Sequence, residues 1–328
     1  MLKDLCLING TSGDESRVRD YIISRLDKNT QYSIDPLGSV IIKSKHLPLI
    51  SVNAHMDEVG FIITGITDDG YLKFSPVGGI DPRVCLDRVI TTENGVKGVI
   101  GDKAFHLLDA DEKDKCPDFK HLLIDIGADS KTEAQDMVPL GTFAYFDSDY
   151  AEFGDGFIKA KALDDRIGCM LMLEMLEEGI DASYCFNVQE EVGLRGAACT
   201  AETVNADIAI VIEATTAADL DGVSGADRVC VLGEGPVVSY MDGRTIYDRK
   251  LYNLAMQVAK ANNIPVQTKT RIAGGNDAGT IQTASGGTRV IAISLPCRYI
   301  HSASSVVKKC DIENTRKLIR ELIKALYD

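Results

Sequence analysis

The chain has 328 residues, of which 45% are hydrophobic and 26% charged, so it is long enough for two ordinary domains with a buried core in each. Its formal net charge is -14 at pH 7. This acidic balance argues against binding to nucleic acid or to an anionic membrane surface, because both partners select basic faces.

The N-terminus and the cysteines indicate where the protein resides. Asp4 falls where a secretory signal peptide needs an uninterrupted apolar core, and no later stretch reaches bilayer-spanning length without charges. The nine cysteines are odd in number and include no C-x-x-C pair, which is typical of reduced thiols. We therefore expect a soluble, cytoplasmic protein.

The first expected elements are a helix, a hairpin and a buried strand. Residues 12–15 have the pattern of a capping box, and apolar residues at helical spacing follow them. Residues 32–34 and 40–42 flank a turn with Pro and Gly and predict a hairpin. The apolar run 48–54 predicts a strand that leads directly into His55, and polar residues at the end of a buried strand are candidates for a functional site.

The pattern changes over residues 66–153, where short strand-like pieces are broken by Gly, Asp and Pro. This predicts a small all-β insert. After it, helical patterns alternate with apolar strands; the helices are expected at 166–176, 251–261 and 312–326, and the strands at 184–188, 208–212 and 290–293. The alternation predicts an α/β fold, a three-layer domain with a mixed, largely parallel sheet, made of residues 1–65 and 154–328.

Acids and histidines lie at the ends of the predicted strands, where a buried core would normally hold apolar residues. They are His55, Asp57, Asp164, Asp165, Glu190, Glu191, Glu213 and His301. Adjacent carboxylates at a buried strand end repel each other unless a cation or a proton separates them. Each pattern alone fits a surface pair or a solvated acidic turn. Together, several carboxylates and two histidines at one edge of a sheet favour a divalent metal.

Five short motifs stand out, and four of them together contain all of these residues except Glu213. The five motifs are 54–61 (AHMDEVGF), 161–166 (KALDDR), 190–193 (EEVG), 274–279 (GGNDAG) and 298–302 (RYIHS). In this order they resemble the motifs of the tetrahedral, glutamyl and deblocking aminopeptidase family, some members of which are labelled endoglucanase M. The similarity runs over essentially the whole chain. It implies a metallopeptidase domain, and it implies a large homo-oligomer, commonly a hollow tetrahedral dodecamer, in which the β insert serves oligomerisation and short peptides are the substrates.

The resemblance also implies a centre of two divalent metal ions per subunit, with zinc or cobalt as the expected metals. The resemblance implies, position by position, that His55, Asp164 and Glu213 hold one ion. The other ion is held by Asp164, Glu191 and His301, so that Asp164 bridges the pair.

Two further roles come from the same resemblance. Glu190 resembles the general base that takes a proton from the metal-bound water, and Asp57 resembles the carboxylate that orients His55. Two positions depart from the family pattern, which often has Asp at the position of Glu213 and Asn at the position of Asp165. We therefore give Asp165 no role.

The sequence thus predicts a metal-dependent aminopeptidase, and other activities stay open. A deacylase or a carboxypeptidase could use the same two-ion chemistry, since fold and ligands do not fix which end of a substrate is bound. A metal-independent endoglucanase would leave His55 and His301 without a task. A catalytically dead binding protein would require a lost ligand or base. The string 274–279 lacks the Lys-Ser/Thr ending of a phosphate-binding loop and is either a tight turn or part of a substrate pocket.

Overall fold

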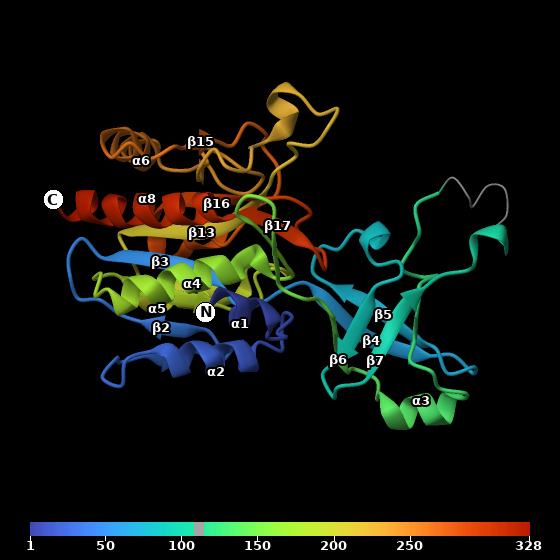
Figure 1. Ribbon diagram of the computed structural model, residues 1–328. Coiled ribbons are helices and arrows are strands. Elements are labelled where there is room, and N and C mark those ends of the chain that lie inside the picture. The colour runs from blue at the N-terminus through green and yellow to red at the C-terminus, as the bar shows by residue number, and fades with distance from the viewer. Residues whose placement is uncertain (108–114) are drawn as a thin grey trace.

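The computed structural model describes residues 1–107 and 115–328 (Figure 1). These residues form an eight-stranded sheet, a three-stranded sheet and a small closed β barrel. Figure 1 shows the large sheet with its helices on the left and the barrel on the right. In the described part of the chain, no helix is both long enough and apolar enough to span a bilayer.

The large sheet has the strand order β1-β2-β12-β3-β13-β16-β14-β15. Its strands are β1 (Ser33–Ile34), β2 (Val40–Ile42), β3 (Ile50–His55), β12 (Ser183–Asn187), β13 (Ile208–Thr216), β14 (Val237–Val238), β15 (Gln267–Thr268) and β16 (Arg289–Cys297). The central strands β12, β3, β13 and β16 run parallel, whereas β2 and β14 pair antiparallel with them on either side. The predicted mixed, largely parallel sheet is therefore confirmed.

Helices cover both faces of this sheet. They are α1 (Leu2–Leu7), α2 (Ser16–Arg25), α4 (Leu163–Glu177), α5 (Arg195–Val204), α6 (Arg249–Ala261), α7 (Ala278–Ile281) and α8 (Lys309–Tyr327). Helix α4 is apolar nearly all round because it lies between the sheet and other helices. Helices α4, α6 and α8 share one core with the strands, and the small side chains of α5 and α7 pack on the opposite face.

The barrel is closed in the order β4-β5-β8-β7-β6-β9. Its strands are β4 (Gly60–Ile66), β5 (Leu72–Val77), β6 (Val89–Thr92), β7 (Lys97–Gly101), β8 (Leu123–Asp125) and β9 (Phe143–Phe146). The ring of Phe61 contacts Phe74 and Phe146 edge-on in its core, with ring centroids 5.1 and 5.0 Å apart. Helix α3 (Lys131–Met137) lies in the same region, so the expectation of strands alone was incomplete.

The remaining elements are short. The three-stranded sheet consists of β10 (Ala151–Phe153), β11 (Phe157–Ala160) and β17 (Ser305–Lys308), and the 3-10 turns are η1 (Pro82–Val84), η2 (Phe105–Leu107), η3 (Gly225–Arg228) and η4 (Ala284–Gly286). Strand β4 of the barrel begins six residues before position 66, and β10 pairs with β11 outside the barrel. The division into a domain of residues 1–65 and 154–328 and an insert of residues 66–153 stays a prediction.

The capping box predicted at residues 12–15 is wrong, although the helix after it is present. Helix α2 begins at Ser16, and the hydroxyl of Ser12 instead donates to Asp57 Oδ2 at 2.6 Å. The carboxylate of Glu15 accepts the backbone N–H groups of Gly13 and Gln189. The motif therefore lies in a loop packed against the end of β3, where long-range acceptors and donors replace the local cap.

A buried cation fastens the N-terminal segment to the end of β3. Arg166, at the start of α4, donates to the carbonyl oxygens of Leu5, Ile8, Gly10 and Met56 and is fully buried. Because a buried guanidinium is costly unless its donors are used, this network fixes the backbone that follows His55.

Candidate metal centre

The predicted site residues come from five elements that meet at one edge of the large sheet. His55 is the last residue of β3, Glu213 lies within β13, Glu190 and Glu191 follow β12, His301 follows β16, and Asp164 lies at the start of α4. The carboxyl ends of parallel strands share one edge of a sheet, so their side chains converge there. The structure brings all seven predicted site residues to this edge, with Asp57 directly behind His55.

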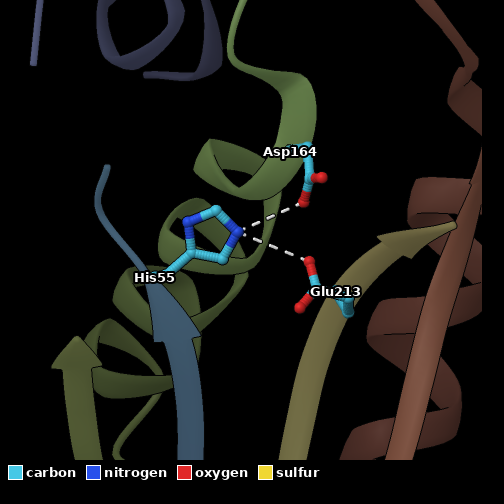
Figure 2. A group of neighbouring side chains, drawn as sticks. All are labelled: His55, Asp164 and Glu213. Atoms are coloured by element: carbon cyan, nitrogen blue, oxygen red, sulfur yellow. Dashed lines mark hydrogen bonds and ion pairs between the residues drawn. The ribbon is translucent and has the colours of Figure 1, made fainter. Parts of the chain in front are cut away.

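The first group consists of His55, Asp164 and Glu213 (Figure 2). Nε2 of His55 lies 3.3 Å from Asp164 Oδ1 and 3.5 Å from Glu213 Oε1. Figure 2 shows the three side chains pointing toward one another from β3, from the start of α4 and from β13. All three are buried.

The second group consists of Asp164, Glu191 and His301. Nε2 of His301 lies 3.4 Å from Asp164 Oδ2 and 3.3 Å from Glu191 Oε1. Asp164 therefore presents one oxygen to each histidine, and the two groups share it. In each group the candidate ligand atoms lie within 4.8 Å of one another.

The carboxylate of Glu190 lies beside both groups. Candidate ligand atoms of His55, Glu190 and Glu191 also lie within 4.8 Å of one another. Burial raises the pKa of Glu190 well above its ordinary value, and the negative charges of Asp277 and Glu191 raise it further.

The outer nitrogen of each histidine has its own acceptor, which fixes the ring. Nδ1 of His55 lies 3.1 Å from the carbonyl oxygen of Asp57 and 3.4 Å from its Oδ1. Nδ1 of His301 lies 2.7 Å from the carbonyl oxygen of Gly79, which follows strand β5 of the barrel. Both rings therefore present Nε2 to the centre, as metal-ligating histidines do.

Asp57 also joins the end of β3 to the loop that carries Glu190 and Glu191. Its Oδ1 accepts the backbone N–H of Glu190 at 3.0 Å, and its Oδ2 accepts that of Glu191 at 3.1 Å. Although burial alone would raise the pKa of Asp57, hydrogen bonds from His55 and Ser12 and from the backbone of Glu190 lower it. Asp57 thus remains an anion, although it belongs to neither of the two candidate ligand groups.

The buried carboxylates of the centre disfavour ionisation of one another. Burial raises the pKa of Glu213 well above its ordinary value and that of Glu191 to about 7. Burial alone would lower the pKa of His301, but Asp164 and Glu191 raise it to about 9. Burial also opposes ionisation of Asp164, yet the two histidines hold its pKa far below the ordinary range. Without a cation, this centre therefore retains protons on acids and imidazoles near neutral pH.

A divalent ion suits this donor set. Oε2 of Glu213 is buried and has no hydrogen-bond partner among the described residues, so an acceptor faces inward unused. Imidazole nitrogens and carboxylate oxygens are ligands for zinc and related transition metals. Both groups offer this combination, and their shared aspartate gives each ion one oxygen.

The centre opens into a cavity of about 580 Å³. Asp164, Glu190, Glu191, Glu213 and His301 belong to its lining. The string 274–279 contributes Gly274, Gly275 and Asn276 to its wall, whereas Asp277 is buried outside it and accepts a hydrogen bond from Asn187. The string therefore forms both a strand-to-helix turn and part of a pocket wall, the two interpretations that the sequence left open.

A sequence model of the M42 glutamyl aminopeptidase family matches residues 38–318. The chain belongs to this family. It is 36% identical to the putative aminopeptidase FrvX of Escherichia coli K12 over 99% of this chain and 95% of that protein, and 32% identical to the lysyl aminopeptidase of Pyrococcus furiosus over 99% and 96%. The resemblance predicted from the motifs is confirmed.

Solved structures of the same family superpose closely. A TET aminopeptidase from Thaumarchaeota archaeon SCGC AB-539-E09 is 35% identical, with a TM-score of 0.92 over 99% of this chain and 95% of that one. The TET1 peptidase of Pyrococcus horikoshii, described as assembling into a tetrahedron or a large octahedral shell, is 33% identical, with a TM-score of 0.86 over 98% and 97%. The predicted fold is confirmed, whereas the roles of individual site residues stay predictions.

Sequence reasoning missed two contributors to the centre of this M42 chain. Ser12 was assigned to a helix cap, although it donates to Asp57. Gly79 acts through its backbone carbonyl, which no side-chain pattern reveals. Asp165, which was given no role, accepts the backbone N–H of Gly168 through one oxygen and leaves the other unpartnered among the described residues.

The protons in the centre predict how the metal-free protein responds to pH. The pKa of Glu191 rises from 4.5 to about 7 on folding, and that of His301 rises from 6.5 to about 9. The folded state therefore binds more protons than the unfolded state between about pH 5 and 9, so stability falls as pH rises through this window. We expect the melting temperature of chelator-treated protein, followed by differential scanning fluorimetry, to decrease from pH 5 to 9.

Added zinc should remove most of this decrease, because the ions take the place of the protons. A Glu191→Gln/His301→Gln double variant is the matched control and should show a shallower decrease without metal. A metal-free protein whose melting temperature is flat or rising over the same range contradicts the assignment of protons to this centre.

Proposed function

We propose that this M42 protein is a metal-dependent aminopeptidase that removes N-terminal residues from short peptides. The observation that carries the proposal is the pair of three-residue groups joined by Asp164, one oxygen of which faces each histidine. This arrangement suits two divalent ions per subunit, zinc or cobalt. When bound, two such ions polarise a carbonyl oxygen and acidify water, which peptide hydrolysis requires.

The ligands divide between the two ions. His55, Asp164 and Glu213 would hold one ion, and the buried Oε2 of Glu213 without a partner supports this set. Asp164, Glu191 and His301 would hold the other. Asp57 would act as a positioning residue, because it contacts Nδ1 of His55 and accepts the backbone N–H groups of both glutamates.

Glu190 is the proposed general base. It lies beside both groups, and burial raises its pKa well above the ordinary value, which strengthens the carboxylate as a proton acceptor. Glu190 would take a proton from the attacking water and deliver it to the departing amine. Adjacent Glu191 can serve as a ligand at the same time, because successive side chains point in different directions.

We also propose a homo-oligomer, such as a tetrahedral dodecamer, assembled through the insert of residues 66–153 on a catalytic domain of residues 1–65 and 154–328. The assembly described for the Pyrococcus horikoshii relative supports this, since that structure covers 98% of this chain. A cytoplasmic location agrees with nine cysteines that all remain free thiols.

A substrate panel tests the activity. Aminoacyl p-nitroanilides, N-blocked peptides and carboxymethylcellulose are offered to the protein, with chelator and then with added zinc or cobalt. We expect release from free N-termini only, abolished by chelator and restored by metal. Cleavage of blocked substrates alone favours the deacylase or carboxypeptidase, and sugar release that ignores chelator favours the endoglucanase. An active protein that contains no metal and ignores chelator rules the proposal out.

The Glu190→Gln variant tests the base. Glutamine keeps the size of the side chain but cannot accept the proton, so we expect kcat to fall by about 100-fold or more while metal content stays at the wild-type value. Glu177→Gln, at an exposed position on α4, is the control and should retain full activity. Metal content is measured by inductively coupled plasma mass spectrometry. Substantial residual turnover, or loss of metal, argues against the base assignment.

The Glu213→Ala variant tests the first ion. Removal of this carboxylate leaves His55 and Asp164 as the only ligands of that group, so we expect one ion per subunit to be lost. Glu213→Asp keeps a carboxylate at the same strand position and should retain more metal than the alanine variant. Unchanged metal content in Glu213→Ala removes this residue from the ligand set.

A further inference from the structure

The lining of the cavity at the candidate metal centre also carries basic side chains. Besides the carboxylate cluster, the lining includes Arg244, Lys269 and Arg271, together with the acids Asp227 and Asp242. Which of these charges remains available to a substrate depends on the contacts that each already makes.

Both acids and two of the three cations are already engaged. Asp242 accepts the backbone N–H groups of Arg244 and Thr245, each at 2.8 Å, and the hydroxyl of Tyr247. Asp227 pairs with Arg271 at 3.2 Å. The ammonium group of Lys269 donates to the carbonyl oxygen of Ala273 at 3.0 Å.

The guanidinium of Arg244 is the exception. Over residues 1–107 and 115–328 it makes no hydrogen bond or ion pair, and the side chain is exposed to the cavity. Its backbone is nevertheless fixed, because its N–H is bound by Asp242. Arg244 is therefore a cation on a rigid turn, and no residue in the described part of the chain neutralises its charge.

The glycine string explains how Arg244 reaches the cavity. A Cβ atom at Gly275 would lie 2.8 Å from Cγ and Cδ of Arg244, and one at Gly279 would lie 3.0 Å from its Cβ. The N–H of Gly243 donates to the carbonyl oxygen of Gly274 at 2.8 Å. The turn 274–279 thus needs glycine because the stem of Arg244 lies directly across it.

We propose that Arg244, supported by the turn 274–279, binds a second charged group of the substrate, a carboxylate. The inference rests on the proposed aminopeptidase function. A guanidinium matches a carboxylate through two parallel N–H donors, and it holds its charge at every physiological pH. A short peptide can supply this carboxylate from either of two sources, and both fit a cavity of about 580 Å³. One source is the side chain of an N-terminal Asp or Glu, and the other is the C-terminus of a dipeptide or tripeptide.

Two substrate pairs distinguish these sources, measured with the metal-loaded, full-length protein. Glutamyl and glutaminyl p-nitroanilide differ only in the side-chain charge, and Leu-Gly and Leu-Gly-amide differ only in the C-terminal charge. For each pair the ratio of kcat/KM for the charged member to that for the neutral member is compared among the wild type, Arg244→Met, Arg244→Lys and Arg271→Met. Methionine keeps an apolar stem against the glycines and removes the guanidinium, with its charge and its hydrogen-bond donors.

We expect Arg244→Met to lower one of the two ratios by about 10- to 100-fold, the range for a charge-assisted hydrogen bond. Arg244→Lys should retain part of the preference, and Arg271→Met should keep the wild-type ratio because its guanidinium already pairs with Asp227. A fall in the first ratio identifies the side chain, and a fall in the second identifies the C-terminus. If Arg244→Met changes neither ratio in an active enzyme, the inference is overturned. A wild type that cleaves none of the four compounds overturns the proposed function instead.

Discussion

The centre of this protein depends on one electrostatic constraint, the burial of four carboxylates at a single edge of a sheet. Asp164, Glu190, Glu191 and Glu213 lie close enough that they cannot all ionise without positive charge between them. The parallel strands impose this proximity, because β3 pairs in fixed register with both neighbours: His55 lies opposite Asn187 of β12, and Asn53 lies opposite Val211 of β13. The fold therefore accumulates negative charge that protons relieve in the metal-free state and that divalent ions would relieve more completely.

The orientation of the site comes from groups outside the ligand sets. Asp57 contacts His55 and binds the backbone of both glutamates, so one anion sets the positions of three candidate site residues. Arg166 fixes the backbone around Met56. The barrel takes part as well, because the carbonyl of Gly79 holds His301, and a Cβ atom added at Gly78 would lie only 3.2 Å from Cβ of Glu191. The region expected to serve assembly thus also forms one wall of the centre.

The sequence predicted what is local or strictly periodic. Strand-end positions identified His55, Glu191 and Glu213, because an acid or histidine after an apolar run conflicts with burial. The helical period identified α4, α6 and α8, and the Pro–Gly turn identified the hairpin of β1 and β2. The short helices α1 and α3 were not predicted, since neither is long enough to show a helical period. The sequence did not reveal Ser12 and Gly79, because their contacts are with residues far along the chain, and Gly79 makes its contact through the backbone carbonyl.

The carboxylate cluster and the wall around Arg244 are built from different kinds of element. The carboxylate cluster is formed by strand termini and by the start of the most buried helix, so its geometry is tied to the core of the fold. The wall around Arg244 is formed by two loops, the turn after β14 and the turn 274–279, which contact each other through Gly243 and Gly274. Loops tolerate substitution more readily than strand termini do. The carboxylate cluster is therefore tied to the core of the fold, whereas the charge that Arg244 brings to the cavity lies on loops that can change without altering that core.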